Sequence, residues 1–103
     1  MSLDDALSSL QKMLSALVRD EAQRLGLQLQ MEEYKDSEEP NAGASILLTI
    51  PRIDVQIWLY QDEANIVRPG IDKRFEKWDY RDTEQLGIAV AEEIRACFRH
   101  IGS

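Results

Sequence analysis

The chain has 103 residues, of which 44% are hydrophobic and 30% charged, and its formal net charge is −7. This length supports one hydrophobic core but not two, and the composition is typical of a globular protein rather than a disordered one. We therefore expect a single domain over residues 1–103. The negative charge repels phosphate backbones, which argues against direct nucleic-acid binding and favours basic partners.

The sequence indicates neither membrane insertion nor a disulfide. No apolar run approaches the roughly 18 residues of a membrane-spanning helix. Met1 is followed by Asp4 and Asp5 rather than by a basic region and an apolar stretch, so no signal peptide is expected. A single cysteine, Cys97, excludes an internal disulfide and a CxxC metal site. These features predict a cytoplasmic protein.

Residues 2–25 have the pattern of an amphipathic helix, with Ser2 as a candidate cap and Gly26 as the stop. Apolar residues recur along it at steps of three and four: Leu3, Leu7, Leu10, Leu14, Leu17, Val18 and Leu25, with Met13 widening the stripe. One face of this helix must therefore pack against another element.

A first strand is predicted directly after this helix, and an exposed loop after the strand. In "LQLQMEEY", residues 27–34, apolar Leu27, Leu29 and Met31 alternate with polar residues, which predicts one buried face. The stretch "KDSEEPNAG" that follows has the composition of a loop. The carboxylates of the chain are densest around this junction: Glu32, Glu33, Asp36, Glu38 and Glu39.

Residues 44–60 predict a hairpin. Two apolar runs meet at "IPRI", where Pro51 cannot donate to a strand ladder and a tight turn is expected. The second strand, "IDVQIWLY" at 53–60, has one ordinary core face. Its other face begins polar and ends with Trp58 and Tyr60, which a strand facing only water has no obvious reason to carry.

The rest of the chain predicts further strands and a second helix. "QDEANIV" suggests a turn and a short strand, "RPG" breaks that strand, and "IDKRFEKWDY" fits either an edge strand or an ordered loop. A helix is expected from Asp82 or Thr83 to about Ile101. Its inner stripe comprises Leu86, Val90, Ile94, Cys97, Phe98 and Ile101.

This order of elements predicts an α+β fold. Short turns between consecutive strands favour an antiparallel meander of three to five strands, with the N- and C-terminal helices packed on one face. Because two helices cover only one face of such a sheet, the opposite face is left without a helix layer.

No residue pattern indicates catalysis, a metal or a cofactor. Cys97 and His100 are spaced to touch on one helix, but Cys97 falls on the apolar stripe and His100 lies near the end of the chain. Neighbouring carboxylates diverge on a helix or strand, and motifs for zinc, phosphate and calcium are missing from the sequence. We predict a protein that is not an enzyme and has no cofactor.

Two aromatic pairs indicate an interaction surface. Trp58 and Tyr60 share a strand face, and "KWDY" repeats this spacing with Trp78 and Tyr80. If both segments are extended neighbours, the four rings form a cluster of the kind that dominates interface hot spots. Equally open is the alternative that the rings shield a second small core, or that Trp78 tucks under the C-terminal helix.

The acidic stretch is the companion candidate for partner binding. A group of carboxylates can steer a basic partner and occupy an electropositive cleft. The candidate residues are Glu32, Glu33, Asp36, Glu38 and Glu39.

In size, acidity and element order the chain resembles the immunity proteins encoded beside bacterial polymorphic toxins of the Rhs and contact-dependent types. The opening "MSLDDALSSLQKML" and the segment from "VQIWLYQ" to "KWDY" are similar to the group that neutralises ADP-ribosyltransferase toxins acting on the translation factor EF-Tu. The resemblance implies a protein, more often monomeric than dimeric, that binds a cognate toxin and occludes its basic active-site cleft without turnover. It assigns no role to individual residues.

A different class also fits the sequence, namely a small acidic secretion chaperone or adaptor. Such a protein normally works as a dimer and holds an extended client, so the oligomeric state separates the two interpretations. A small enzyme would instead need a deep pocket with convergent carboxylates.

Overall fold

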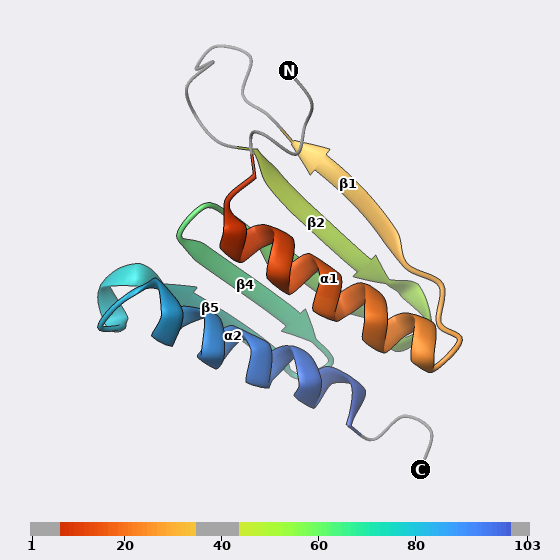
Figure 1. Ribbon diagram of the computed structural model, residues 1–103. Helices are drawn as coiled ribbons and strands as arrows, with labels where there is room; N and C mark the ends of the chain where they lie inside the picture. The colour runs from red at the N-terminus through yellow and green to blue at the C-terminus, as the bar shows by residue number, and fades with distance from the viewer. Residues whose placement is uncertain (1–6, 35–43, 100–103) are drawn as a thin grey trace.

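The computed structural model describes residues 7–34 and 44–99 of the chain. Five strands form one antiparallel sheet in the order β1-β2-β3-β4-β5, so each strand pairs with its neighbours in sequence, and both helices lie on one face of it (Figure 1). This confirms the predicted α+β meander. The elements are α1 (Ser9–Arg24), β1 (Gln30–Tyr34), β2 (Ser45–Ile50), β3 (Val55–Leu59), β4 (Glu63–Arg68), β5 (Ile71–Glu76) and α2 (Thr83–Phe98).

Helix α1 begins at Ser9 because Ser8 forms a complete capping box with Gln11. The Gln11 backbone N–H donates to Ser8 Oγ at 3.1 Å, and the Ser8 N–H donates to Gln11 Oε1 at 2.8 Å. The expected cap, Ser2, lies outside the described residues. At the other end Gly26 adopts a φ of 67°, which favours glycine and confirms it as the stop.

The core lies between the helices and the inner face of the sheet. On β2 and β3 every second residue is buried, as are Ala64 and Ile66 on β4. Pairs such as Leu48 with Ile57 and Ile57 with Ile66 extend this layer across the sheet. The helices contribute the residues that oppose them: Leu10, Leu14, Val18 and Ala22 from α1, and Leu86, Val90, Ile94, Cys97 and Phe98 from α2. Most residues of the predicted stripes therefore face the sheet. Met13 is 55% exposed instead, and Leu3 and Ile101 lie outside the described residues.

The two helices approach each other closely at Gly87 of α2. A Cβ atom at that position would lie 2.9 Å from Leu10 Cδ1 and 3.4 Å from Met13 Cε. The absence of a side chain at Gly87 thus allows α2 to pack against Leu10 of α1.

Glu93 connects α2 to strands β4 and β5 through two ion pairs. The Glu93 side chain is almost fully buried. Its Oε1 lies 3.0 Å from Arg68 Nε on β4, and its Oε2 lies 3.3 Å from Lys73 Nζ on β5. Both carboxylate oxygens are therefore paired, as a buried charge requires.

The prediction that the first strand has one buried face was wrong. All five residues of β1 are exposed, including Met31, while Leu27 and Leu29 pack partly against the core before the strand begins. Met31 is opposite the buried Leu48 and so points to the helix side. Helix α1 packs over β2 and β3, however, which leaves the edge strand β1 with little cover (Figure 1).

Two turns decide how the sheet is built. Pro51–Ile53 form one turn of 3-10 helix and Asp54 follows with a φ of 55°, which closes the predicted hairpin between β2 and β3. Residues 71–80, for which strand and loop were both open, divide into strand β5 and a 3-10 turn at Lys77–Asp79.

Within the described part of the chain, neither helix combines the length and apolar character that spanning a bilayer requires.

Candidate functional site

The sheet face opposite the helices, called here the open face, carries a continuous row of side chains. Strand pairing aligns Glu32, Leu47, Trp58, Asn65 and Arg74, one residue from each strand. Leu47, Trp58 and Asn65 in the middle are half-buried, whereas the acidic and basic ends of the row are exposed. The row therefore has Leu47, Trp58 and the amide of Asn65 between opposite charges.

Trp58 is the centre of an aromatic triplet made up of Tyr34, Trp58 and Tyr60. The centroid of the Trp58 ring lies 6.3 Å from that of Tyr60, with the ring planes only 6° apart, and 5.8 Å from that of Tyr34, with a tilt of 32°. Tyr34 and Tyr60 remain 46% and 38% exposed. Three ring faces are thus held together on a surface that neither helix covers.

The β1 side of the triplet is acidic. The Tyr34 hydroxyl donates a hydrogen bond to the Glu32 carboxylate. This hydrogen bond, with a smaller contribution from burial and from the charge of Glu32, raises the pKa of Tyr34 above its ordinary value. The Tyr34 hydrogen bond also holds the Glu32 carboxylate beside the aromatic rings.

The four-ring cluster expected from the sequence does not form. Trp78 lies in the 3-10 turn after β5 and is 66% exposed, and its Nε1 donates to Glu76 Oε2 at 2.7 Å. Tyr80 packs against the hydrophobic core instead, and Trp78 does not tuck under α2. The extended segment ends at Glu76, before the aromatic pair, which is why the repeated spacing does not place these rings beside Trp58 and Tyr60.

The acidic candidates divide between different surfaces. Glu32 lies on the open face, whereas Glu33 is opposite the buried Ile46 and points to the helix side, where it lines a small cavity with Lys12 and Arg19. Alternation along a strand forces this separation. The remaining acids of the group, Asp36, Glu38 and Glu39, lie outside the described residues.

Tyr34 is the member of the triplet that the sequence did not reveal. A signal was present, because Gln30, Glu32 and Tyr34 form the second face of the predicted first strand. That face becomes important only once the register pairs Tyr34 with Ser45 and brings its ring to Trp58.

The buried thiol of Cys97 is unsuited to act as a nucleophile at neutral pH. Burial is the main cause that raises its pKa to about 11, the Glu93 charge adds to it, and the Arg68 charge partly opposes it. His100 lies outside the described residues. Among residues 7–34 and 44–99, no group of three or more His, Cys, Asp or Glu side chains is placed to hold a metal ion.

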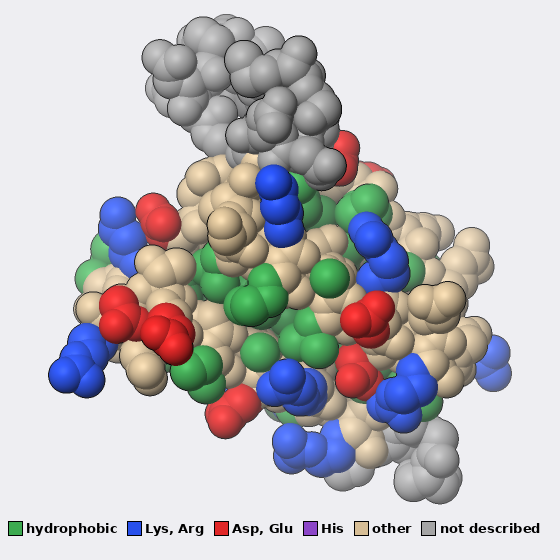
Figure 2. All heavy atoms as spheres, viewed as in Figure 1, with side chains coloured by type: hydrophobic (Ala, Val, Ile, Leu, Met, Phe, Trp, Pro, Cys, Tyr) green, Lys and Arg blue, Asp and Glu red, His purple; other side chains and the backbone are tan. Residues whose placement is uncertain are grey.

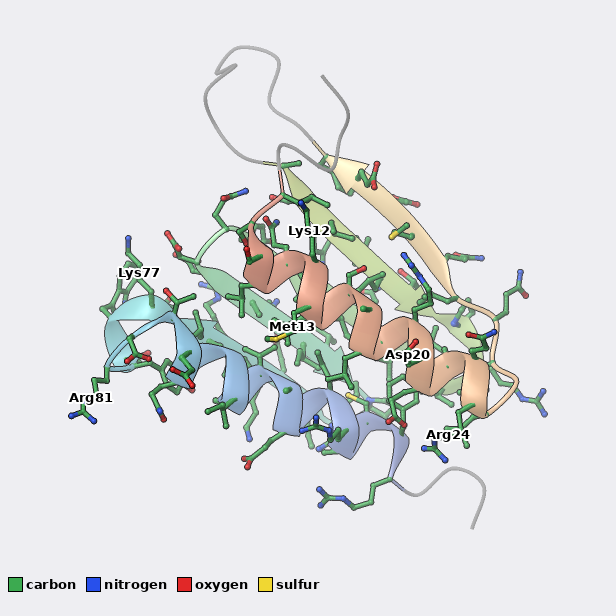
Figure 3. All side chains as sticks on the ribbon, viewed as in Figure 1. Lys12, Met13, Asp20, Arg24, Lys77 and Arg81 are labelled. Carbon is green, nitrogen blue, oxygen red and sulfur yellow. The ribbon has the colours of Figure 1, made fainter. Side chains whose placement is uncertain are left out.

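A second apolar surface lies on the outer side of the helix layer. A groove of about 520 Å³ runs between α1 and α2, with Leu10, Met13, Ile88 and Ala91 in its lining and Glu84, Glu92 and Arg95 beside them. Figure 2 shows hydrophobic side chains gathered between the helices and charged ones around them, and Figure 3 shows Met13 pointing from α1 toward α2. Met13 and Ile88 are each about half exposed.

Comparison of the chain with protein-family models, with curated proteins and with solved structures finds no match.

Proposed function

We propose that this protein binds another protein through its open face and acts by covering that partner's surface rather than by catalysis. The aromatic triplet is the observation that supports the proposal. Tryptophan and tyrosine contribute most when they lie near the centre of an interface and lose their remaining water on binding. Trp58 would lie at the centre of such an interface, because Tyr34 and Tyr60 flank it and the charged ends of its row lie at the periphery.

The partner in this proposal is a bacterial toxin with a basic active-site cleft, possessing for example ADP-ribosyltransferase activity. The resemblance to polymorphic-toxin immunity proteins and the net charge of −7 support this finer assignment. Protection against a lethal partner requires fast capture and slow release. The acidic surface would accelerate capture, and burial of the triplet would slow release.

We place the protein in the cytoplasm, where such a toxin would otherwise act. The one cysteine is unpaired and buried, which suits a reducing compartment.

Capture followed by a growth assay tests this function. The immobilised protein is exposed to native lysate of its source organism, and the retained polypeptide is identified and expressed in a bacterial host. We expect that polypeptide to stop growth and co-expression of the wild-type protein to restore it. The variant Tyr34→Ala, Trp58→Ala, Tyr60→Ala should fail to restore growth.

A variant of the opposite surface is the matched control. Met13→Ser with Ile88→Ser removes exposed apolar side chains from the helix groove and leaves the open face intact. This variant should protect as the wild type does. Equal protection by the triplet variant, at equal protein levels, would overturn the proposal.

The helix groove favours one other function, that of a secretion chaperone or adaptor. Apolar side chains of an unfolded client segment would fit its lining of Leu10, Met13, Ile88 and Ala91. Under this alternative the Met13→Ser, Ile88→Ser variant loses its client and the triplet variant keeps it. The two variants therefore give opposite results for the two functions.

A further inference from the structure

A notch adjoins the aromatic triplet at the end of the sheet where β3 turns into β4. Its volume is about 410 Å³, and Tyr60 and Trp78 both contribute to its lining. The other lining residues are Ser45, Gln61, Asp62, Glu63 and Lys77. Tyr60 belongs to both surfaces, so the notch is continuous with the open face.

Strand pairing brings these residues together although they come from two turns. The Tyr60 N–H donates to the Glu63 carbonyl at 2.9 Å and closes the turn between β3 and β4. Glu63 is opposite Glu76 in the β4–β5 pair, so the 3-10 turn that follows Glu76 lies next to the first turn. The hydrogen bond from Trp78 Nε1 to Glu76 then fixes the indole while leaving it 66% exposed.

Negative charge dominates at this place. Among the described residues, Asp62 and Glu63 line the notch and Glu76 accepts the hydrogen bond of the indole, whereas Lys77 is the one positive charge in the lining. Lys77 Nζ lies 3.5 Å from Asp62 Oδ2, and both side chains are more than half exposed. Figure 3 places Lys77 at the turn that joins β5 to α2. The ammonium group of Lys77 thus pairs with one of the two carboxylates that line the notch.

We propose that this notch binds a basic side chain, an arginine guanidinium or a lysine ammonium, presented by the partner that covers the open face. Aromatic faces attract cations, and the attraction grows as the cation loses water. Carboxylates beside the rings add charge-assisted hydrogen bonds. The inference rests on the proposed function and names the chemistry of one contact at its edge.

Titration with small cations tests the notch without the partner. Nα-acetyl-arginine methylamide and Nα-acetyl-lysine methylamide are the probes, and the indole N–H resonances of the two tryptophans are followed by NMR. We expect a saturable shift at Trp78, with a smaller one at Trp58, which lies outside the notch. Nα-acetyl-norleucine methylamide, which has no charge, should leave Trp78 unmoved.

Charge variants sharpen the test. Because Lys77 pairs with Asp62, one of the notch carboxylates, Lys77→Met should lower the dissociation constant of the arginine probe, by about twofold to fivefold for an exposed ion pair. Asp62→Asn with Glu63→Gln should raise it. Equal shifts from the norleucine probe, no shift at Trp78, or weaker binding by Lys77→Met would each overturn the assignment.

Failure of the notch and failure of the proposed function give different results. If the probes do not bind but capture of the partner depends on Trp58, partner binding by the open face is supported and cation binding by the notch is contradicted. If the probes bind but capture of a partner does not depend on Trp58, cation binding by the notch is supported and partner binding by the open face is contradicted.

Discussion

At the residue scale, Gln11 shows most clearly how a single polar side chain holds the fold together. Its amide is fully buried and donates to the carbonyls of Ala44 at 2.6 Å and Leu59 at 3.1 Å, while its Oε1 accepts from Gln61 Nε2 at 3.0 Å. Because Gln11 also completes the cap of α1, it connects the start of the helix to both strands of the central hairpin. The sequence shows only a polar residue beside Leu10.

We expect Gln11→Leu to lower the free energy of unfolding by about 1–3 kcal/mol, because it leaves two buried carbonyl groups without this donor. Urea denaturation measures the effect. Gln23→Leu, an exposed position on the same helix, is the matched control and should stay within about 0.5 kcal/mol of the wild type. Equal losses in the two variants would contradict the assigned role of Gln11.

The Cys97 thiol should make stability fall with rising pH. Its pKa is raised from 9.0 to about 11 in the folded chain, with burial as the main cause. Between pH 9.0 and about 11 the unfolded chain has lost the thiol proton and the folded chain retains it, so ionisation of the thiol favours unfolding. The stabilisation is fully present below pH 9.0 and is lost as the pH approaches about 11.

Denaturation of the wild type and of Cys97→Ala across this pH range measures the contribution. The unfolding free energy of the wild type should fall relative to that of Cys97→Ala as the pH rises. Parallel pH profiles would show that the thiol ionises equally in both states.

At the scale of elements, the close contact between the helices makes Gly87 a sensitive position. Gly87→Val would place a branched side chain where even a Cβ lies 2.9 Å from Leu10 Cδ1, and overpacking of this kind costs about 1–3 kcal/mol. Glu92→Val introduces the same side chain at an exposed position of the same helix and is the comparison variant, which should lose less stability. Thermal unfolding compares them, and a loss no larger than that of Glu92→Val would contradict the close approach.

The elements also show how far the sequence predicts the structure. Periodicity gave both helices, the meander and the hairpin at Pro51, because each of these buries one face and alternation records that burial. It failed at β1, where the Leu27, Leu29 and Met31 alternation suggested burial that the position of α1 does not supply. It also could not place Trp78 and Tyr80, because the end of β5 depends on a turn rather than on a pattern.

For the candidate site, Trp58 and Tyr60 could be predicted and Tyr34 could not. The first two are neighbours in one strand, so alternation alone places them on one face. Tyr34 joins them through two steps of pairing, from β1 to β2 and from β2 to β3. The β1–β2 and β2–β3 registers that bring Tyr34 to Trp58 depend on the complete fold, so the sequence pattern of one strand does not predict them.

At the scale of the whole molecule, we expect an acidic monomer that associates with its partner faster at low salt. Light scattering should give a mass near 11.8 kDa for the isolated protein. The association rate with the captured partner should fall as salt rises, because the charges that steer the encounter are screened. A stable dimer would favour the chaperone alternative, and an association rate independent of salt would contradict electrostatic steering.

The measurement that tests the open face most directly is the dissociation constant of the captured partner for Trp58→Ala, beside that for Met13→Ser with Ile88→Ser. Circular dichroism first establishes that both variants are folded. A central interface residue costs about 2 kcal/mol or more when truncated, which is roughly a thirtyfold rise in the dissociation constant. We predict at least this rise for Trp58→Ala and no change for the helix-groove variant; the reverse pattern would contradict the open face as the binding surface.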